Sequence, residues 1–185
     1  MAEYAKKLPQ SQLNEMFIAD LGDAFVARTA ETLKPLQLLL ALPSTIPAKV
    51  YLYNCTGPMG GRPGTEYKIQ LIIDNQRPGE RKTLDDPDGG FTFVVGYSNP
   101  LNDPNYGIYI IWETGKHREF AYSANLQVKL EYMLDTLGAP IVYQTKRKTK
   151  EVLVMAQRNH LVEALQARMD VDAEKMTGAW EYVFD

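Results

Sequence analysis

The sequence predicts a mainly β fold with some α-helix, in which about seven short strands form a barrel or a sandwich. From Ala48 onward, runs rich in aromatic and β-branched residues alternate with loops rich in Gly, Pro, Asn and Asp. Before that point, apolar residues recur every three or four positions, as they do on one face of a helix. We therefore expect an N-terminal helical segment over residues 1–47 and a β domain over residues 48–185, with an acidic tail after Asp170.

The composition is ordinary for a soluble globular protein. The 185 residues are 45% hydrophobic and 23% charged, which suffices for the core of one domain. The formal net charge of −3 provides no strong overall attraction to nucleic acid. One cysteine excludes an internal disulfide and, with two histidines, argues against a structural zinc site, so we expect neither metal nor cofactor. No apolar segment reaches the length of a signal core or a membrane span, which predicts a cytoplasmic protein.

Two helices are expected in the N-terminal segment. Ser11 can cap the first, whose apolar face continues to about Leu33. The second is short, over residues 36–42, because Pro35 suits the first turn of a helix. Within the β domain, apolar spacing predicts two further helices, over residues 126–137 and 159–169.

The β domain begins with an aromatic strand over residues 49–54. In the next run, Tyr67, Ile69 and Leu71 fall on one face and Lys68 and Gln70 on the other, as in a half-buried strand. Turn-forming residues separate the strands, and their short spacing favours a barrel or sandwich over a wound parallel sheet. The strands after the first are expected at residues 67–74, 91–97, 107–113, 120–123, 140–145 and 151–157.

A loop rich in glycine and proline connects the first two strands and carries Arg62 at its tip. Such a loop holds a defined shape, because proline restricts φ and glycine permits positive φ. A P-loop or a dinucleotide-binding loop would lead into a helix, whereas this loop leads into a strand. Two interpretations remain: a plain connection, or a loop that presents Arg62 to a ligand.

Glu66 and Lys68 form the Glu-x-Lys half of a metal-dependent nuclease signature. In such a site, two carboxylates hold a divalent ion and the lysine helps to position the attacking water. The strand over residues 49–54 contains no carboxylate, and the nearest upstream aspartates fall in the first predicted helix. Nuclease chemistry is therefore an alternative and not the main prediction.

Basic residues are concentrated between Lys116 and Lys150, although the whole chain is acidic. Such a patch can bind phosphates, with an affinity that falls as salt rises. For the turn over residues 146–150, a solvated polar surface is the simpler interpretation. Arginine pairs with guanine, and asparagine or glutamine with adenine, through paired hydrogen bonds. Side chains able to contact base edges are Arg62, His117, Arg118, Ser123, Asn125 and Gln127.

Residues 53–62, 66–70 and 120–129 resemble the DNA-recognition modules of bacterial restriction enzymes. The predicted layout over residues 49–169 is similar to the N-terminal effector domain of EcoRII-type restriction enzymes such as UbaLAI. That domain shares a pseudobarrel with the plant B-three transcription-factor domain. The resemblance implies a DNA-binding pseudobarrel of seven strands with inserted short helices, and two arms that grip the major groove. The arms would be residues 56–66 and 114–123, side by side on one edge of the barrel.

The resulting prediction is a recognition domain of a restriction endonuclease that binds a specific sequence in double-stranded DNA and has no catalysis of its own. The resemblance implies a short site of the CC(A/T)GG kind and a nuclease domain in the same full-length protein. Two alternatives stay open: a nuclease that uses Glu66 and Lys68, and a module that binds a protein partner. The expected DNA-binding residues are Gly60, Gly61, Arg62, Lys68, Lys116, His117, Arg118, Tyr122, Ser123, Asn125, Gln127, Lys129, Lys146, Arg147 and Lys148.

Overall fold

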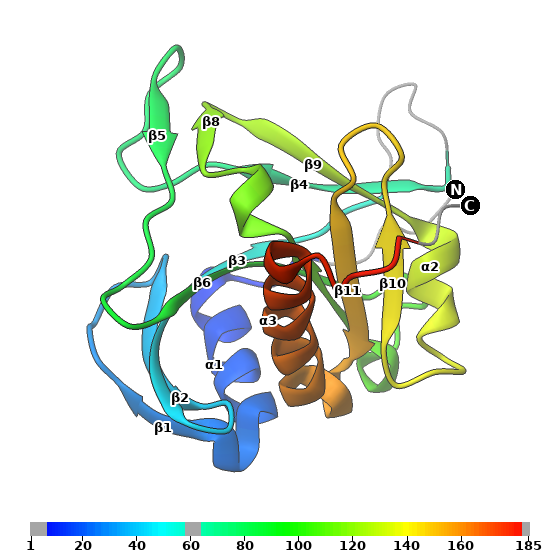
Figure 1. Ribbon diagram of the computed structural model, residues 1–185, viewed down its shortest axis with the longest axis horizontal. Helices are drawn as coiled ribbons and strands as arrows, with labels where there is room; N and C mark the ends of the chain where they lie inside the picture. The colour runs from blue at the N-terminus through cyan, green and yellow to red at the C-terminus, as the bar shows by residue number, and fades with distance from the viewer. Residues whose placement is uncertain (1–6, 58–63, 183–185) are drawn as a thin grey trace.

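The computed structural model describes residues 7–57 and 64–182, and it is mainly β with a few helices, as predicted (Figure 1). Most strands form one open, mixed sheet of seven strands in the order β1-β2-β3-β6-β7-β11-β10. The expected barrel is not formed by these residues, because the edge strands β1 and β10 do not pair with each other. All neighbours in this sheet are antiparallel except β3 and β6. Its strands are β1 (Phe25–Arg28), β2 (Leu36–Ala41), β3 (Thr45–Asn54), β6 (Phe91–Ser98), β7 (Ile108–Trp112), β10 (Val142–Thr145) and β11 (Val152–Gln157).

Two smaller antiparallel pairs accompany the large sheet. The first pairs β4 (Glu66–Leu71) with β9 (Ala124–Lys129), and the second pairs β5 (Arg81–Thr83) with β8 (Glu119–Ala121). The α-helices are α1 (Gln10–Leu21), α2 (Leu130–Asp135) and α3 (Leu161–Thr177). Short 3-10 turns are η1 (Gly22–Ala24), η2 (Pro104–Tyr106), η3 (Thr114–Lys116) and η4 (Arg158–His160).

The large sheet is covered on both faces, which gives the molecule three layers. On one face, α1 and α3 bury side chains such as Phe17 and Leu165 against the sheet. On the other face, the β4–β9 pair and α2 bury Ile69, Leu126 and Met133. Successive side chains along the central strands of the sheet point alternately into these two cores. Strand β7 is buried over its whole length. A strand that is buried on both faces must be apolar throughout, and for this reason β7 consists of the continuous run Ile-Tyr-Ile-Ile-Trp.

Three expectations about secondary structure were wrong. The first helix ends at Leu21, where Gly22 takes a positive φ of 53°, and the chain enters β1. Residues 36–42, expected as a helix, contain β2, because alternate leucines enter the core and the backbone pairs with strands on both sides. Residues 126–137 divide into β9 and α2. Residues 47 and 48 both belong to β3, and the division into a helical segment and a β domain stays a prediction.

None of the helices in the described residues is long and apolar enough to cross a membrane.

The β4–β9 pair approaches the sheet closely at Gly96 of β6. A Cβ atom at Gly96 would lie 2.9 Å from Trp112, 3.0 Å from Ile69 and 3.1 Å from Cys55. We expect Gly96→Ala to lower the free energy of unfolding by about 1–3 kcal/mol, because the added methyl overpacks this core. Denaturation in urea measures the change.

The matched control is Gly115→Ala, since a Cβ there meets nothing within 4 Å. Its free energy of unfolding should change by less than about 0.5 kcal/mol. Equal stability of the two variants would contradict the close approach of β4 to β6.

Candidate nucleic-acid interface

The β4–β9 pair forms a two-stranded ribbon with one apolar and one polar face. The strands pair antiparallel, from Glu66 opposite Lys129 to Leu71 opposite Ala124. Ile69, Leu71, Leu126 and Val128 point inward and are buried. Because side chains alternate along a strand, the intervening residues share the outer surface. We call this surface the ribbon face; it comprises Glu66, Lys68, Gln70, Asn125, Gln127 and Lys129.

Two contacts hold the ribbon face in position. The Lys68 ammonium donates a hydrogen bond of 2.9 Å to Oδ1 of Asn125, diagonally across the two strands. Underneath, the Trp112 indole N–H donates to the Gln127 carbonyl at 3.2 Å, which ties β9 to the large sheet. The side chains of the ribbon face are therefore presented by backbone that is fixed to the core.

A basic cleft adjoins one end of the ribbon. Its volume is about 590 Å³, and the turn between β10 and β11 forms its other wall. The backbone N–H of Lys129 donates to the Gln144 side chain at 3.1 Å, which connects the ribbon to β10. The basic residues in its lining are Lys129, Lys146, Arg147 and Lys148, and Glu66 is the one carboxylate among the described lining residues. The structure thus brings together four residues that the sequence predicted as DNA contacts.

The structure describes only the two ends of the first expected arm, residues 56–57 and 64–66. The first arm joins β4 at Glu66, and the carbonyl of Thr65 accepts a 2.7 Å hydrogen bond from Leu130, so this junction lies at the α2 end of the ribbon. The second arm ends in β8 and the turn that precedes Ala124, at the opposite end (Figure 1). Six paired residues of β4 separate the two ends, about 17 Å of strand. The side-by-side placement of the two arms stays a prediction, because residues 58–63 of the first arm lie outside the described residues.

Two predicted base-reading residues already have partners within the chain. Nε2 of His117 lies 2.5 Å from Oε2 of Glu151, at the start of β11. The Arg118 guanidinium makes two hydrogen bonds to Asp86, of 3.0 and 2.8 Å, and one of 2.9 Å to the carbonyl of Leu84. Partial burial acts to raise the pKa of Asp86, but the hydrogen bonds from Arg118 and Thr92 outweigh it and lower that pKa. A DNA role for His117 and Arg118 stays a prediction, and it requires these contacts to be exchanged.

The remaining predicted residues are spread over two places. Lys116 is exposed at the end of η3, and Tyr122 and Ser123 form the turn between β8 and β9, where Ser123 has a φ of 60°. Gly60, Gly61 and Arg62 lie outside the described residues.

The nuclease alternative gains no support from the geometry. Glu66 and Lys68 share the ribbon face, but Glu66 lies opposite Lys129. In the part of the chain that the structure describes, no three His, Cys, Asp or Glu side chains gather closely enough to hold a metal ion. The second carboxylate that a nuclease site needs is thus not supplied by these residues.

A comparison with protein families matches residues 46–165 to methylase-associated X1. The chain belongs to the methylase-associated X1 family. Searches of curated proteins and of solved structures find no significant match. The part of this methylase-associated X1 protein that matches the family contains the whole ribbon and the turn between β10 and β11.

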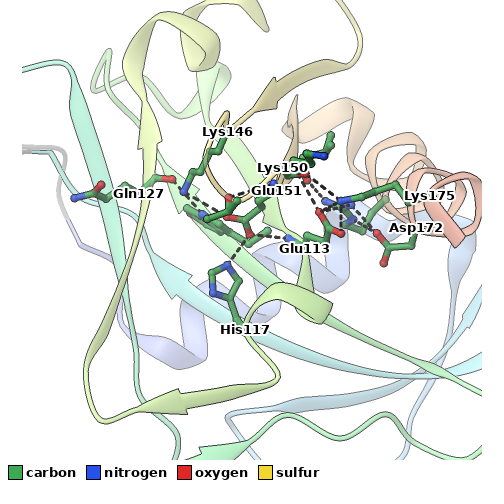
Figure 2. A network of polar contacts seen from close by, with 12 residues as sticks. Glu113, His117, Gln127, Lys146, Lys150, Glu151, Asp172 and Lys175 are labelled. Carbon is green, nitrogen blue, oxygen red and sulfur yellow. Dashed lines mark hydrogen bonds and ion pairs between the residues drawn. The ribbon is translucent and has the colours of Figure 1, made fainter. Parts of the chain in front are cut away.

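Sequence reasoning missed a buried ionic network in this methylase-associated X1 protein (Figure 2). Glu113 accepts bonds of 2.6 and 2.7 Å from the Lys175 ammonium and one of 3.0 Å from the backbone N–H of Val152. Arg168, fully buried, donates to Asp172 at 2.6 Å and to the carbonyl of Val152. These contacts fix α3 to the ends of β7 and β11. The only signal in the sequence was the position of Glu113 and Glu151 at the ends of apolar strands.

Glu151 connects this network to the basic cleft. Its carboxylate accepts from the backbone N–H of Glu113 at 3.3 Å and lies 3.4 Å from the ammonium of Lys146. Burial acts to raise the pKa of Glu151, but the hydrogen bond from His117 and the charges of His117 and Lys146 outweigh it, so the pKa is lowered. Glu151 therefore holds the turn that carries the basic residues.

We expect Glu151→Gln to lower the free energy of unfolding by about 1–3 kcal/mol at pH 7, because a buried ionised acceptor is lost. A carboxyl with a lowered pKa contributes stability above its unfolded pKa of about 4.3, and this contribution disappears as the pH falls through the folded value. The difference from the wild type should therefore shrink below about pH 4.3. Denaturation in urea at a series of pH values measures it.

Glu163→Gln is the control, because Glu163 also contacts a histidine, His160, but its side chain is 57% exposed. Its effect at pH 7 should stay below about 0.5 kcal/mol. A Glu151→Gln effect that does not change with pH would contradict the ionised state of Glu151.

Proposed function

We propose that this methylase-associated X1 protein recognises a specific sequence in double-stranded DNA, as the recognition module of a restriction-modification system. The observation that carries the proposal is the ribbon face, an antiparallel two-stranded ribbon with amide and lysine side chains outward and its inner face buried. A two-stranded β-ribbon fits the major groove of B-DNA, which is about 12 Å wide. The interface differs from the two-armed grip that the resemblance implied.

The side chains of the ribbon face suit base readout. Gln70 and Asn125 lie opposite each other on the two strands, and both are exposed. Each can form paired hydrogen bonds to N6 and N7 of an adenine, and Lys68, opposite Gln127 on the same face, can donate to O6 or N7 of a guanine. Such fixed donors and acceptors on a rigid scaffold favour one base sequence over others. A site with a central A/T pair, of the CC(A/T)GG kind, is compatible with these side chains.

The basic cleft suits the phosphate backbone. Lys129 belongs to both the ribbon face and the cleft, so a duplex on the ribbon can extend toward Lys146, Arg147 and Lys148. Phosphate contacts of this kind position a protein on DNA and supply most of the salt-dependent affinity.

The family supports the cellular context of the proposal. Its name links its members to methylases, and DNA methylases act with restriction enzymes on shared recognition sequences. We assign methyl transfer or cleavage to a partner domain, and recognition to this one. An effector role like that of the EcoRII-type domain, in which bound DNA stimulates a nuclease, is one form of the same proposal.

We expect this protein to enrich one sequence from a pool of randomised duplexes. On that sequence, Gln70→Ala or Asn125→Ala should each weaken binding by about 1–3 kcal/mol and relax the preference at one base position. Gel shifts with the enriched duplex and its single-base variants measure both effects. Running the selection on methylated and unmethylated pools tests in addition whether methylation changes the preferred site.

The control for the ribbon is Gln166→Ala on α3, across the sheet from the ribbon face. It should bind as the wild type does. If no sequence is enriched, or if Gln166→Ala weakens binding as much as Gln70→Ala, the ribbon is not the reading surface.

The cleft should behave differently from the ribbon. We expect Lys146→Gln and Lys148→Gln to weaken binding about equally for all duplex sequences. Each should reduce the slope of log affinity against log salt by about 1, because one phosphate contact is lost. Binding titrations between about 50 and 200 mM salt test this. A change of sequence preference in either variant, with no change of slope, would contradict a phosphate role.

A further inference from the structure

A second polar pocket lies on the other side of β4 from β9, where the ends of β3 and β4 meet the N-terminal segment. Its volume is about 390 Å³. Lys7, Lys34 and Lys68 all line it, and none of its described lining residues is Asp or Glu. In a chain with more acidic than basic residues, three lysines around one small pocket are a marked concentration of positive charge. The composition of the pocket points to an anionic ligand.

The walls of the pocket are fixed by hydrogen bonds. Asn54 bonds through its side chain to both the N–H and the carbonyl of Leu8, each at 2.9 Å. The Gln10 amide donates to the carbonyl of Leu52 at 3.1 Å, and the Tyr53 hydroxyl donates to the carbonyl of Ile72 at 3.0 Å. Because these contacts join segments far apart in the sequence, the pocket is built before any ligand enters.

The three lysines have no ionic partner among the described residues. None of them lies within 4.0 Å of a carboxylate there. Lys68 donates to the neutral Asn125, and the Lys34 ammonium lies 4.2 Å from the centre of the Tyr53 ring. Burial lowers the pKa of Lys34, and the charge of Asp74 opposes this only in part. A partly desolvated cation of this kind gains most from an anion that replaces its lost water.

Helix α1 adds to the positive potential. Gln10, in the lining, is the first residue of this 12-residue helix. The helix has no capping side chain and no acidic residue in its first turn. Its N-terminal partial charge is therefore not offset within the helix, and such ends favour anions.

We propose that this pocket binds a phosphate group. Three ammonium groups match the several oxygens and the negative charge of a phosphate better than a single carboxylate would. Lys68 also belongs to the ribbon face, so a phosphate here would sit beside DNA on the ribbon. If the phosphate is part of a DNA backbone, the inference rests on the proposed function; if it belongs to a free nucleotide, it does not.

The test compares Lys34→Gln and Lys7→Gln with the wild type. Lys34→Gln keeps a polar side chain, shorter by one atom, and removes its charge. Lys68 is left intact because it also belongs to the ribbon. The control is Lys82→Gln on β5, a lysine outside the pocket whose side chain is 40% exposed. The probes are inorganic phosphate, adenosine 5′-monophosphate and the enriched duplex, all at low ionic strength, where screening is weak.

Phosphate binding is followed by the NMR shifts of the backbone amides of Tyr53, Asn54 and Thr56. We expect inorganic phosphate to shift them in the wild type and in Lys82→Gln, and to bind about three- to tenfold more weakly to Lys34→Gln. If the source is the DNA backbone, Lys34→Gln also weakens duplex binding and reduces the salt slope by about 1, whereas the mononucleotide binds no better than phosphate. If the source is a free nucleotide, the mononucleotide binds more tightly than phosphate and the duplex affinity is unchanged.

Either pattern supports a phosphate pocket. The inference is overturned if phosphate, mononucleotide and duplex all bind equally to the wild type and to the Lys34→Gln and Lys7→Gln variants, or if none of them shifts these amides. Because the ribbon is tested through Gln70 and Asn125, the proposed recognition function can fail while the pocket binds phosphate, and the pocket can fail while the ribbon reads DNA.

Discussion

The structure depends on the burial of the large sheet on both of its faces. Its central strands β6, β7 and β11 are buried over almost their whole length, so each face needs a covering layer. Helices α1 and α3 cover one face, and the ribbon of β4 and β9 covers much of the other. The ribbon is therefore no free hairpin: its inner residues are part of the core, and the same alternation that buries Ile69 and Leu126 turns Gln70 and Asn125 outward. The positions of the side chains in the proposed interface are therefore set by the packing of the core beneath them.

The two layers also differ in charge, which explains how an acidic chain can present a basic surface. On α3, Glu163, Asp170 and Glu174 are exposed. On the opposite side of the sheet, lysines of the ribbon face, the basic cleft and the phosphate pocket lie near one another along β4. At physiological salt, charges on opposite faces are largely screened from each other, since the Debye length is about 8 Å. The local charge of each face then matters more for binding than the net charge of −3.

The sequence allowed the mainly β class and most strands of the β domain to be predicted, because alternation and turn residues are local signals. The inward and outward faces of β4 were correct for the same reason. The prediction failed at β2 and β9, where apolar residues that fit a helical spacing also alternate as in a strand. In both places pairing with neighbouring strands decides the outcome, and a sequence does not reveal its partners. The basic residues of the cleft were among the predicted DNA contacts. Their position beside the ribbon could not be predicted, because it depends on which strands pair.

The phosphate pocket lay beyond sequence reasoning for a further reason. Lys7, Lys34 and Lys68 come from three separate segments, and nothing in the sequence links Lys7 and Lys34 to Lys68. They meet because Asn54 holds the segment before α1 against the end of β3, while Thr56 extends that strand to pair with Lys68 through two backbone hydrogen bonds of 2.9 and 3.1 Å. Lys68 thus stands between the pocket and the ribbon face, and its hydrogen bond to Asn125 joins the two. A phosphate that attracts the Lys68 ammonium would weaken that bond and release Oδ1 of Asn125, an acceptor for adenine N6. Occupation of the pocket and readout by the ribbon would then be coupled through a single side chain.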